Sequence, residues 1–354
     1  MSSNGRAVLV TGASGLVGHE LLEQLRQADD VTVVGTSRRG SRDLGITAWD
    51  MSTEPAPADL DRSWDVIINA AANTRWTMSQ EEATAANVAS VQALKALVNE
   101  QTHVVHVSTA YAVGLRGDVE SADPDDYRNT YEWSKAHAER VAHDLFDRLT
   151  IVRPPLIVGR RSDGRAARFS GMYTLIRGMT VGTVPAVVAS PDARFDAIPV
   201  DDLCHLILML AAEPSAGDHR VQTIAAGAAA PTVEEAVKTI VDSLNGWRLN
   251  QGSEPLDTPP LITPDSWDRF FRPFVREHLT PRQQLILDLL GSFEPYLALS
   301  EPLIPDHGVG DILPCIRTST TFWAETNHRL AGLTPKPWQG MDKPPAEKVE
   351  ASNA

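Results

Sequence analysis

A tyrosine and a lysine four residues apart are the residues of this chain best suited to chemistry. They stand in the run Tyr131-Glu132-Trp133-Ser134-Lys135. Positions i and i+4 of a helix share a face, so the ammonium of Lys135 is predicted to lie close to the phenol of Tyr131. A free tyrosine has a pKa of about 10, and a nearby ammonium lowers it by favouring the phenolate. The pair could then transfer a proton at neutral pH, although this spacing also occurs by chance on surface helices.

A hydroxyl pair, Ser108 and Thr109, ends the apolar run at residues 103–107. Thr109 is predicted to orient a substrate carbonyl while Tyr131 supplies a proton to its oxygen. The predicted catalytic set is therefore Thr109, Tyr131 and Lys135. Tyr131 and Lys135 are also predicted cofactor contacts, because the ammonium can hydrogen-bond a nucleotide ribose.

Three glycines stand between a predicted strand and a predicted helix, in Thr11-Gly12-Ala13-Ser14-Gly15-Leu16-Val17-Gly18. Gly12 permits a tight turn, Gly15 lets a pyrophosphate approach the backbone, and Gly18 lets helix and strand pack closely. This context predicts a dinucleotide-binding turn, with a purely structural glycine turn as the alternative. The predicted cofactor contacts in the turn are Gly12, Ser14, Gly15, Leu16 and Val17.

The end of the second predicted strand indicates which dinucleotide binds. NAD enzymes usually place Asp or Glu there for the ribose 2′-hydroxyl, whereas this chain has Ser37-Arg38-Arg39. Arg38 is predicted to bind the 2′-phosphate of NADP(H) through its planar guanidinium, unless both arginines are merely solvated. Asp50 and its neighbour Met51 end the third strand and are predicted to meet the adenine, although a turn aspartate would be equally ordinary.

Two more segments follow predicted strands. The small residues of Asn69-Ala70-Ala71-Ala72 leave room for a cofactor, although they also suit helix packing. The prolines of Arg153-Pro154-Pro155 fix a bend and leave backbone groups free for a nicotinamide carboxamide, with a simple strand terminator as the alternative. The predicted contacts in these segments are Ala70, Ala71, Ala72, Pro154 and Ile157.

The elements that must position these residues alternate along the first half of the chain. Amphipathic helical patterns separate continuous apolar strand-like runs, which predicts a doubly wound parallel Rossmann sheet with its ligand at the carboxyl ends of the strands. Later in the chain, helices are predicted at 202–212, capped by Asp201 or Asp202, and at 233–244, where Thr232 and Glu235 form a capping box. The strand-like runs are 7–11, 31–36, 65–71, 103–109 and 150–158.

The predicted fold class is thus α/β, with a smaller, mostly helical C-terminal part. Residues 1–160 are assigned to the cofactor-binding core with the catalytic residues. Residues 161–340 are assigned to substrate binding, with 220–230 returning to the sheet and the aromatic-rich stretch 265–300 forming a lid or simply core. The Pro-, Lys- and Glu-rich tail 341–354 is predicted to be disordered.

Composition restricts the partners. The 354 residues carry a formal charge of −14, which argues against nucleic acid as a main partner. Cys204 and Cys315 lack metal-ligand spacing, so no metal is predicted and both are interpreted as reduced thiols of a cytoplasmic protein. The chain has no apolar run long enough to span a membrane, so integral membrane association is not expected.

These elements, in this order, resemble an extended short-chain dehydrogenase/reductase over residues 6 to about 245. The resemblance implies that Tyr131 is the acid, Lys135 its partner and Thr109 the hydroxyl member, and that Asn87 is the asparagine of the helix over the sheet. Residues 197–203 resemble the segment that precedes a helix in the substrate half of that superfamily. Many relatives dimerise through helices that correspond to about 80–100 and 131–149, which implies a homodimer.

Within the superfamily the chain is most similar to fatty acyl-CoA reductases and to the thioester-reductase domains of carboxylic acid reductases and peptide synthetases. This likeness implies NADPH-dependent reduction of an acyl thioester, bound to CoA or to an acyl carrier protein, to an aldehyde or alcohol. The chain is shorter than typical fatty acyl-CoA reductases, and in residues 300–340 we identify no motif of these families. The runs that carry the likeness are 68–76, 107–111, 129–135 and 152–155.

Three other functions of the same fold stay open. A nucleotide-sugar epimerase or dehydratase usually needs arginines for a diphosphate, and many carry a carboxylate beside the hydroxyl, where this chain has Ala110-Tyr111. A ketone or hydroxysteroid dehydrogenase is not excluded by any residue. A non-enzymatic NADP sensor would tend to lose the Tyr-x-x-x-Lys pair, which is intact here.

Overall fold

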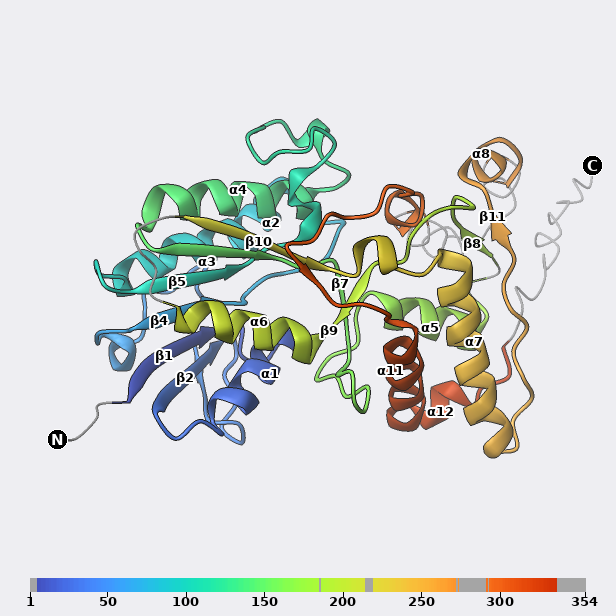
Figure 1. Ribbon diagram of the computed structural model, residues 1–354, viewed down its shortest axis with the longest axis horizontal. Helices are drawn as coiled ribbons and strands as arrows, with labels where there is room; N and C mark the ends of the chain where they lie inside the picture. The colour runs from blue at the N-terminus through green and yellow to red at the C-terminus, as the bar shows by residue number, and fades with distance from the viewer. Residues whose placement is uncertain are drawn as a thin grey trace, which may run out of the picture. The chain divides into compact units, whose positions relative to one another are not determined.

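The computed structural model describes residues 5–335 apart from 185, 214–218, 272, 274–290 and 292. Its centre is an eight-stranded sheet in the order β12-β10-β6-β5-β4-β1-β2-β3, and each neighbouring pair is parallel (Figure 1). The strands are β1 (Arg6–Thr11), β2 (Val31–Ser37), β3 (Ile46–Ala48), β4 (Val66–Asn69), β5 (His103–Val107), β6 (Leu149–Arg153), β10 (Arg220–Ala225) and β12 (His307–Gly308).

Strand order reverses at β1, which the chain leaves first toward β2 and β3 and later toward β4 on the other side. Thr11, the last residue of β1, is in register with Thr36 of β2 and Asn69 of β4. In doubly wound sheets the ligand lies at this reversal, outside the carboxyl ends of the strands. The predicted Rossmann fold is confirmed.

Each central strand is buried on both faces because its residues alternate between two cores. In β1, Val8 and Val10 pack with Leu21 and Leu203 of helices α1 (Leu16–Leu25) and α6 (Val200–Ala212), whereas Leu9 packs into the opposite core. That second core lies beneath α4 (Thr130–Leu145) and the helical run α2 (Gln80–Ala83), η2 (Thr84–Val88), α3 (Ala89–Ala93) and η3 (Leu94–Leu97). Two buried faces explain why these strands read as continuous apolar runs.

The predicted strand 150–158 is two strands. It divides at Pro154 and Pro155, which have no N–H group to donate to a ladder. The first half is β6, and the second, β7 (Leu156–Val158), pairs with β9 (Ala197–Pro199) in a separate two-stranded sheet.

The two later helices begin differently from each other. The capping box of Thr232 and Glu235 is confirmed at the start of α7 (Val233–Asn250). The predicted aspartate cap of the other helix is wrong, because α6 begins at Val200 directly after Pro199 and has no side-chain cap. Asp201 instead accepts a hydrogen bond from the backbone N–H of Arg161 at 2.9 Å.

The chain forms two compact units that interleave along the sequence. Unit 1 comprises Met1–Met172, Asp196–Pro231 and Pro302–Phe322 and holds the eight-stranded sheet. Unit 2 comprises Tyr173–Phe195, Thr232–Glu301 and Trp323–Ala354; it contains α7, most of α5 (Met172–Val181), and the pair β8 (Val187–Val188) and β11 (Leu261–Ile262). Strand β10, within the stretch 220–230, pairs with β6.

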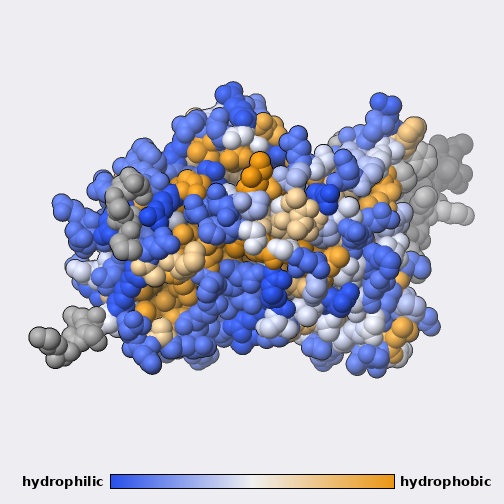
Figure 2. All heavy atoms as spheres, viewed as in Figure 1, coloured by the Kyte–Doolittle hydropathy of each residue, from blue (hydrophilic) through white to orange (hydrophobic). Residues whose placement is uncertain are grey.

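Much of the aromatic-rich stretch 265–300, and the whole tail 341–354, lie outside the described residues. Within the stretch, Trp267 is buried, whereas the Phe270 side chain is 70% exposed. Hydrophilic residues cover most of the surface in Figure 2, and the hydrophobic ones gather in separate patches. None of the helices in the described ranges has both the length and the apolar character that a membrane span requires.

Candidate active site

The glycine turn between β1 and α1 brings backbone against backbone. Gly12 has φ of +68°, and a Cβ atom on it would lie 2.5 Å from the carbonyl oxygen of Ala70. A Cβ on Gly18 would collide with the carbonyl oxygen of Gly12. Two of the three glycines are therefore required by packing alone, as the sequence predicted for the turn and for helix–strand contact.

The third glycine leaves the start of α1 available for an anion. Gly15 is the N-cap of α1, no side chain in the described chain caps the helix, and its first turn has no acidic residue. The helix begins with Leu16 and Val17, whose backbone N–H groups belong to the unpaired first turn. Uncapped N–H groups and the positive end of the helix dipole fit the pyrophosphate of a dinucleotide.

The end of β2 offers a second polar feature. The Oγ of Ser37 is buried, with 7% of the residue exposed, and has no hydrogen-bond partner among the described residues. Arg38 and Arg39 follow it and are exposed. A buried hydroxyl beside two cations fits an anionic group such as a ribose 2′-phosphate.

Asp50 stabilises a turn, which was the alternative to adenine binding in the sequence analysis. Its Oδ1 accepts hydrogen bonds from the Ser52 N–H at 3.1 Å and from the Ser52 Oγ at 2.6 Å. These bonds, and the charge of Arg38, lower the pKa of Asp50 below its usual value. Met51 is buried beside it with 9% exposure.

The segment after β4 lies against the glycine turn, as the contact between Ala70 and Gly12 shows. Ala70 and Ala71 are half-buried and Ala72 is exposed. After β6, the carbonyl of Pro154 accepts a hydrogen bond from the Ala110 N–H at 2.8 Å. The expectation that the prolines leave free backbone groups is thus wrong for this carbonyl; Pro154 is buried and Ile157 half-buried.

The structure brings Thr109 and Tyr131 together. Thr109 is buried after β5, where its Oγ accepts from the Tyr111 N–H at 3.4 Å, and Tyr131 lies in the first turn of α4. Burial raises the pKa of Tyr131 to about 12, and the nearby Thr109 hydroxyl opposes this rise. Tyr111, the other tyrosine near the site, is half-buried, and burial also raises its pKa.

Lys135 is buried, with 1% of the residue exposed. Its Nζ donates to the carbonyl of Val107 at 2.7 Å and lies 3.3 Å from Nε2 of His106. Burial lowers the pKa of Lys135 to about 8, against an opposing effect of the Glu139 carboxylate. The sequence predicted the shared helix face, but the predicted lowering of the Tyr131 pKa by Lys135 is wrong, because burial raises that pKa and the Lys135 ammonium lies at Val107 and His106 instead.

A buried carboxylate ties the catalytic strand ends to α4. Glu139, 2% exposed, accepts hydrogen bonds from Arg153 Nε at 3.0 Å and Nη2 at 2.5 Å, and from the Ser108 hydroxyl. Arg153 ends β6 and Ser108 follows β5, so one side chain of α4 fixes both strands. The spacing of Glu139 four residues after Lys135 was the available sequence signal.

Asn87 links the loop that holds Asn73 to the catalytic helix. Its Oδ1 accepts from the Asn73 N–H at 2.8 Å, and its Nδ2 donates to the Asn73 carbonyl at 3.1 Å and to the Ser134 Oγ at 2.9 Å. It lies in the π-helical turn η2. Such turns often occur at functional sites. The position fits the role that the family resemblance implied.

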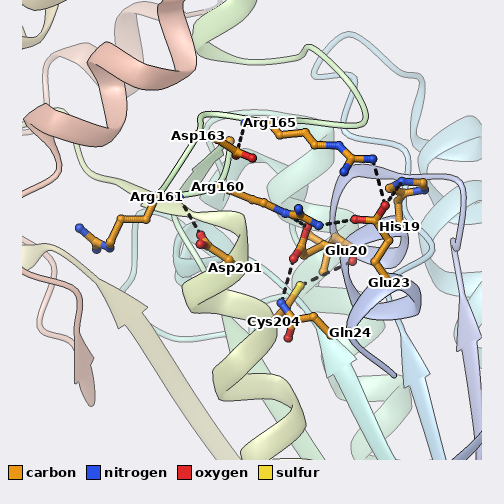
Figure 3. Close-up of polar contacts among 12 residues, drawn as sticks. His19, Glu20, Glu23, Gln24, Arg160, Arg161, Asp163, Arg165, Asp201 and Cys204 are labelled. Atoms are coloured by element: carbon orange, nitrogen blue, oxygen red, sulfur yellow. Dashed lines mark hydrogen bonds and ion pairs between the residues drawn. The ribbon is translucent and has the colours of Figure 1, made fainter. Parts of the chain in front are cut away.

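Arginines after β7 tether this segment to α1. Arg160 points toward Glu20 and Glu23, and its Nε lies 2.7 Å from a Glu20 oxygen (Figure 3). Arg165 pairs with Glu23 at 3.0 Å. Arg168 donates to the carbonyl of Ser14 within the glycine turn at 2.7 Å. No motif in the sequence signalled these contacts.

Comparison with known proteins confirms the family resemblance. Residues 41–207 match the NAD-binding family described as male sterility protein. Fatty acyl-CoA reductase 1 of Gallus gallus and that of Xenopus laevis are each 25% identical over 280 residues. The match covers 58% of this chain and 54% of each relative, so the chain spans about half the length of these curated relatives.

Solved structures share the fold. The terminal R domain of the myxalamid pathway has a TM-score of 0.65 at 19% identity, covering 95% of this chain and 94% of that one. An archaeal thiolation-reductase di-domain has a TM-score of 0.60 at 17% identity, covering 92% and 91%. UDP-glucuronic acid 4-epimerase from Bacillus cereus, in complex with NAD, has a TM-score of 0.52 at 17% identity, covering 73% and 87%. The chain therefore shares the fold of these two reductase structures and of the epimerase.

Proposed function

We propose that this protein is an NADPH-dependent reductase of an acyl thioester. The observation that carries the proposal is that the buried Thr109 after β5 faces the helix α4, which holds Tyr131 and the buried Lys135, closely enough for its hydroxyl to oppose the rise in the pKa of Tyr131. The similarity to fatty acyl-CoA reductases and reductase domains supports the thioester as substrate. We assign cofactor binding and catalysis to residues 1–160 and substrate binding to the later part of the chain.

The nicotinamide, when bound, supplies a hydride to the carbonyl carbon of the thioester. The negative charge that then develops on oxygen needs a proton and a second hydrogen bond. Tyr131 gives the proton and Thr109 the hydrogen bond. Loss of the thiol from the resulting hemithioacetal leaves an aldehyde, which a second round would convert to an alcohol. The thiol would belong to CoA or to an acyl carrier protein.

The substrate and the acid are tested together. NADPH oxidation is measured against acyl-CoA thioesters, aldehydes, ketones and nucleotide sugars. We expect turnover with thioesters, and a loss of about 100-fold or more in Tyr131→Phe, the usual contribution of general acid catalysis. Tyr127→Phe is the matched control, because the hydroxyl of the buried Tyr127 donates to the Ser121 carbonyl and not to a residue of the predicted catalytic set. Turnover of ketones or nucleotide sugars alone, or full activity of Tyr131→Phe, contradicts the proposal.

The choice of NADPH over NADH rests on Ser37, Arg38 and the missing carboxylate at the end of β2. Arg38→Ala should weaken NADPH binding by about 1.5–3 kcal/mol, the scale of a charge-assisted hydrogen bond, and leave NADH binding nearly unchanged. Calorimetric titration of both cofactors measures this. Equal weakening of the two would exclude a 2′-phosphate role for Arg38. An NADPH-dependent reductase with two free, buried thiols fits a cytoplasmic protein.

A further inference from the structure

A chain of buried polar side chains runs from the glycine-turn strand to the active-site lysine. The Thr11 hydroxyl donates to Asn69 Oδ1 at 2.7 Å, and Asn69 Nδ2 lies 3.2 Å from Nδ1 of His106. Nε2 of the same ring lies 3.3 Å from Nζ of Lys135. All four residues are at most 1% exposed, so bulk water does not compete for their hydrogen bonds.

The orientation of the Asn69 amide is set by its neighbour. The backbone N–H of Ala71 lies 3.3 Å from Oδ1 and can only donate. Turning the amide over would place the Nδ2 donor against this N–H and remove the acceptor of Thr11. The Nδ2 group therefore faces His106 and donates to Nδ1 of the ring.

This donor decides where the imidazole keeps its proton. Burial, and the charge of Lys135, hold the pKa of His106 well below its usual value, so the ring is neutral and has one N–H. Because Nδ1 accepts from Asn69, the N–H is on Nε2 and points at Lys135. An ammonium there would set donor against donor, whereas a neutral amine accepts from Nε2–H and still donates to the Val107 carbonyl.

We propose that Thr11, Asn69 and His106 act as a positioning relay that selects the Nε2–H tautomer and thereby favours the uncharged amine of Lys135. The inference rests on the proposed function for its catalytic meaning. A relay that favours the amine lowers the fraction of Lys135 that is an ammonium at a given pH, and only the ammonium can supply a proton to the active site.

Other charges near Lys135 do not replace this effect. On α4, the Glu139 carboxylate favours the ammonium, but it is already paired with Arg153 from the end of β6 and bonded to Ser108. Tyr131 is neutral below its raised pKa. The residues that β1 and β4 add to the relay are uncharged. The tautomer of His106 therefore determines whether the Lys135 Nζ accepts a hydrogen bond from the ring or donates one to it.

The full-length protein allows a test that needs no substrate. Long-range ¹H–¹⁵N spectra of histidine-labelled protein report the tautomer of each ring, and His106 is assigned by its loss in His106→Gln. The chain has six lysines, so the Lys135 ε-methylene signal can be followed by pH titration and assigned with Lys135→Arg. We expect His106 to carry its proton on Nε2, with and without NADPH. A ring protonated on Nδ1 overturns the inference.

Asn69→Ala removes the donor to Nδ1 and frees the ring to present Nε2 as an acceptor. The titration midpoint of Lys135 should then rise by about one pH unit or more, the scale of one hydrogen bond to a charged group. Thr150→Val is the matched control. It breaks the buried 2.9 Å contact between Thr150 and His103, and His103 lies on the same strand as His106 but outside the relay. An unchanged midpoint in Asn69→Ala, or an equal rise in the control, refutes the relay.

These readouts separate the inference from the proposed function. Failure of every thioester to react would leave the tautomer and the titration as measured, whereas an Nδ1–H ring would leave thioester reduction standing. If Asn69→Ala does not fold, the tautomer of the unmodified protein still decides the question.

Discussion

The ion pair between Glu139 and Arg153 should contribute strongly to the stability of unit 1, and Glu139→Gln isolates that contribution. The substitution keeps the volume of the side chain and removes its charge. Glu139 is 2% exposed and Arg153 15%, and two guanidinium nitrogens lie 3.0 and 2.5 Å from the carboxylate oxygens. The guanidinium would be left facing a neutral amide with little access to water.

The size of the effect follows from this burial. Removal of one partner from a buried ion pair usually costs about 3–5 kcal/mol of stability. Because glutamine can still accept one hydrogen bond and Arg153 retains some contact with water, we expect a loss of about 2 kcal/mol for Glu139→Gln. Glu139→Ala, which removes all three acceptor contacts, should lose about 3 kcal/mol or more.

The measurement is urea denaturation followed by both tryptophan fluorescence and circular dichroism, whose transitions must coincide for a two-state analysis. Glu213→Gln is the matched control in the same unit. Its pair with Arg220 has the same 2.5 Å separation, but the side chains are 46% and 37% exposed. An exposed pair contributes about 0–1 kcal/mol. If the losses in free energy of unfolding of the two glutamine variants differ by less than about 0.5 kcal/mol, burial does not control the strength of this pair.

Two further predictions concern turnover and the cofactor turn. The pKa of Lys135 is lowered to about 8, so its ammonium is present below that pH and lost above it. The kcat/KM for reduction should therefore fall as pH rises through about 8, and a profile that stays flat to pH 10 contradicts a role for the ammonium. Gly12→Ala should lower stability by about 1–3 kcal/mol and abolish NADPH binding in calorimetry, because φ of +68° strains any other residue and the added Cβ meets Ala70; wild-type affinity for NADPH would contradict this account of the turn.

The sequence by itself determined the fold and the identity of the chemical groups. Continuous apolar runs indicate strands that are buried on both faces and so predict a parallel sheet. This signal is local, since each strand carries it independently. The i, i+4 spacing of Tyr131 and Lys135 is also local, as is the glycine turn with its positive φ at Gly12. Local patterns of this kind survive without knowledge of the rest of the chain.

Only the tertiary structure decided how those groups are paired. The bend at Pro154 sent the second half of one predicted strand into another sheet, and the carbonyl expected to be free was taken by Ala110. Lys135 met the ring of His106, 29 residues earlier, because β5 runs beneath α4. Arg160 reached Glu20 across 140 residues. Such contacts depend on where strand ends meet in the sheet and on which donors burial leaves to be satisfied, and neither is encoded in the spacing of any single segment.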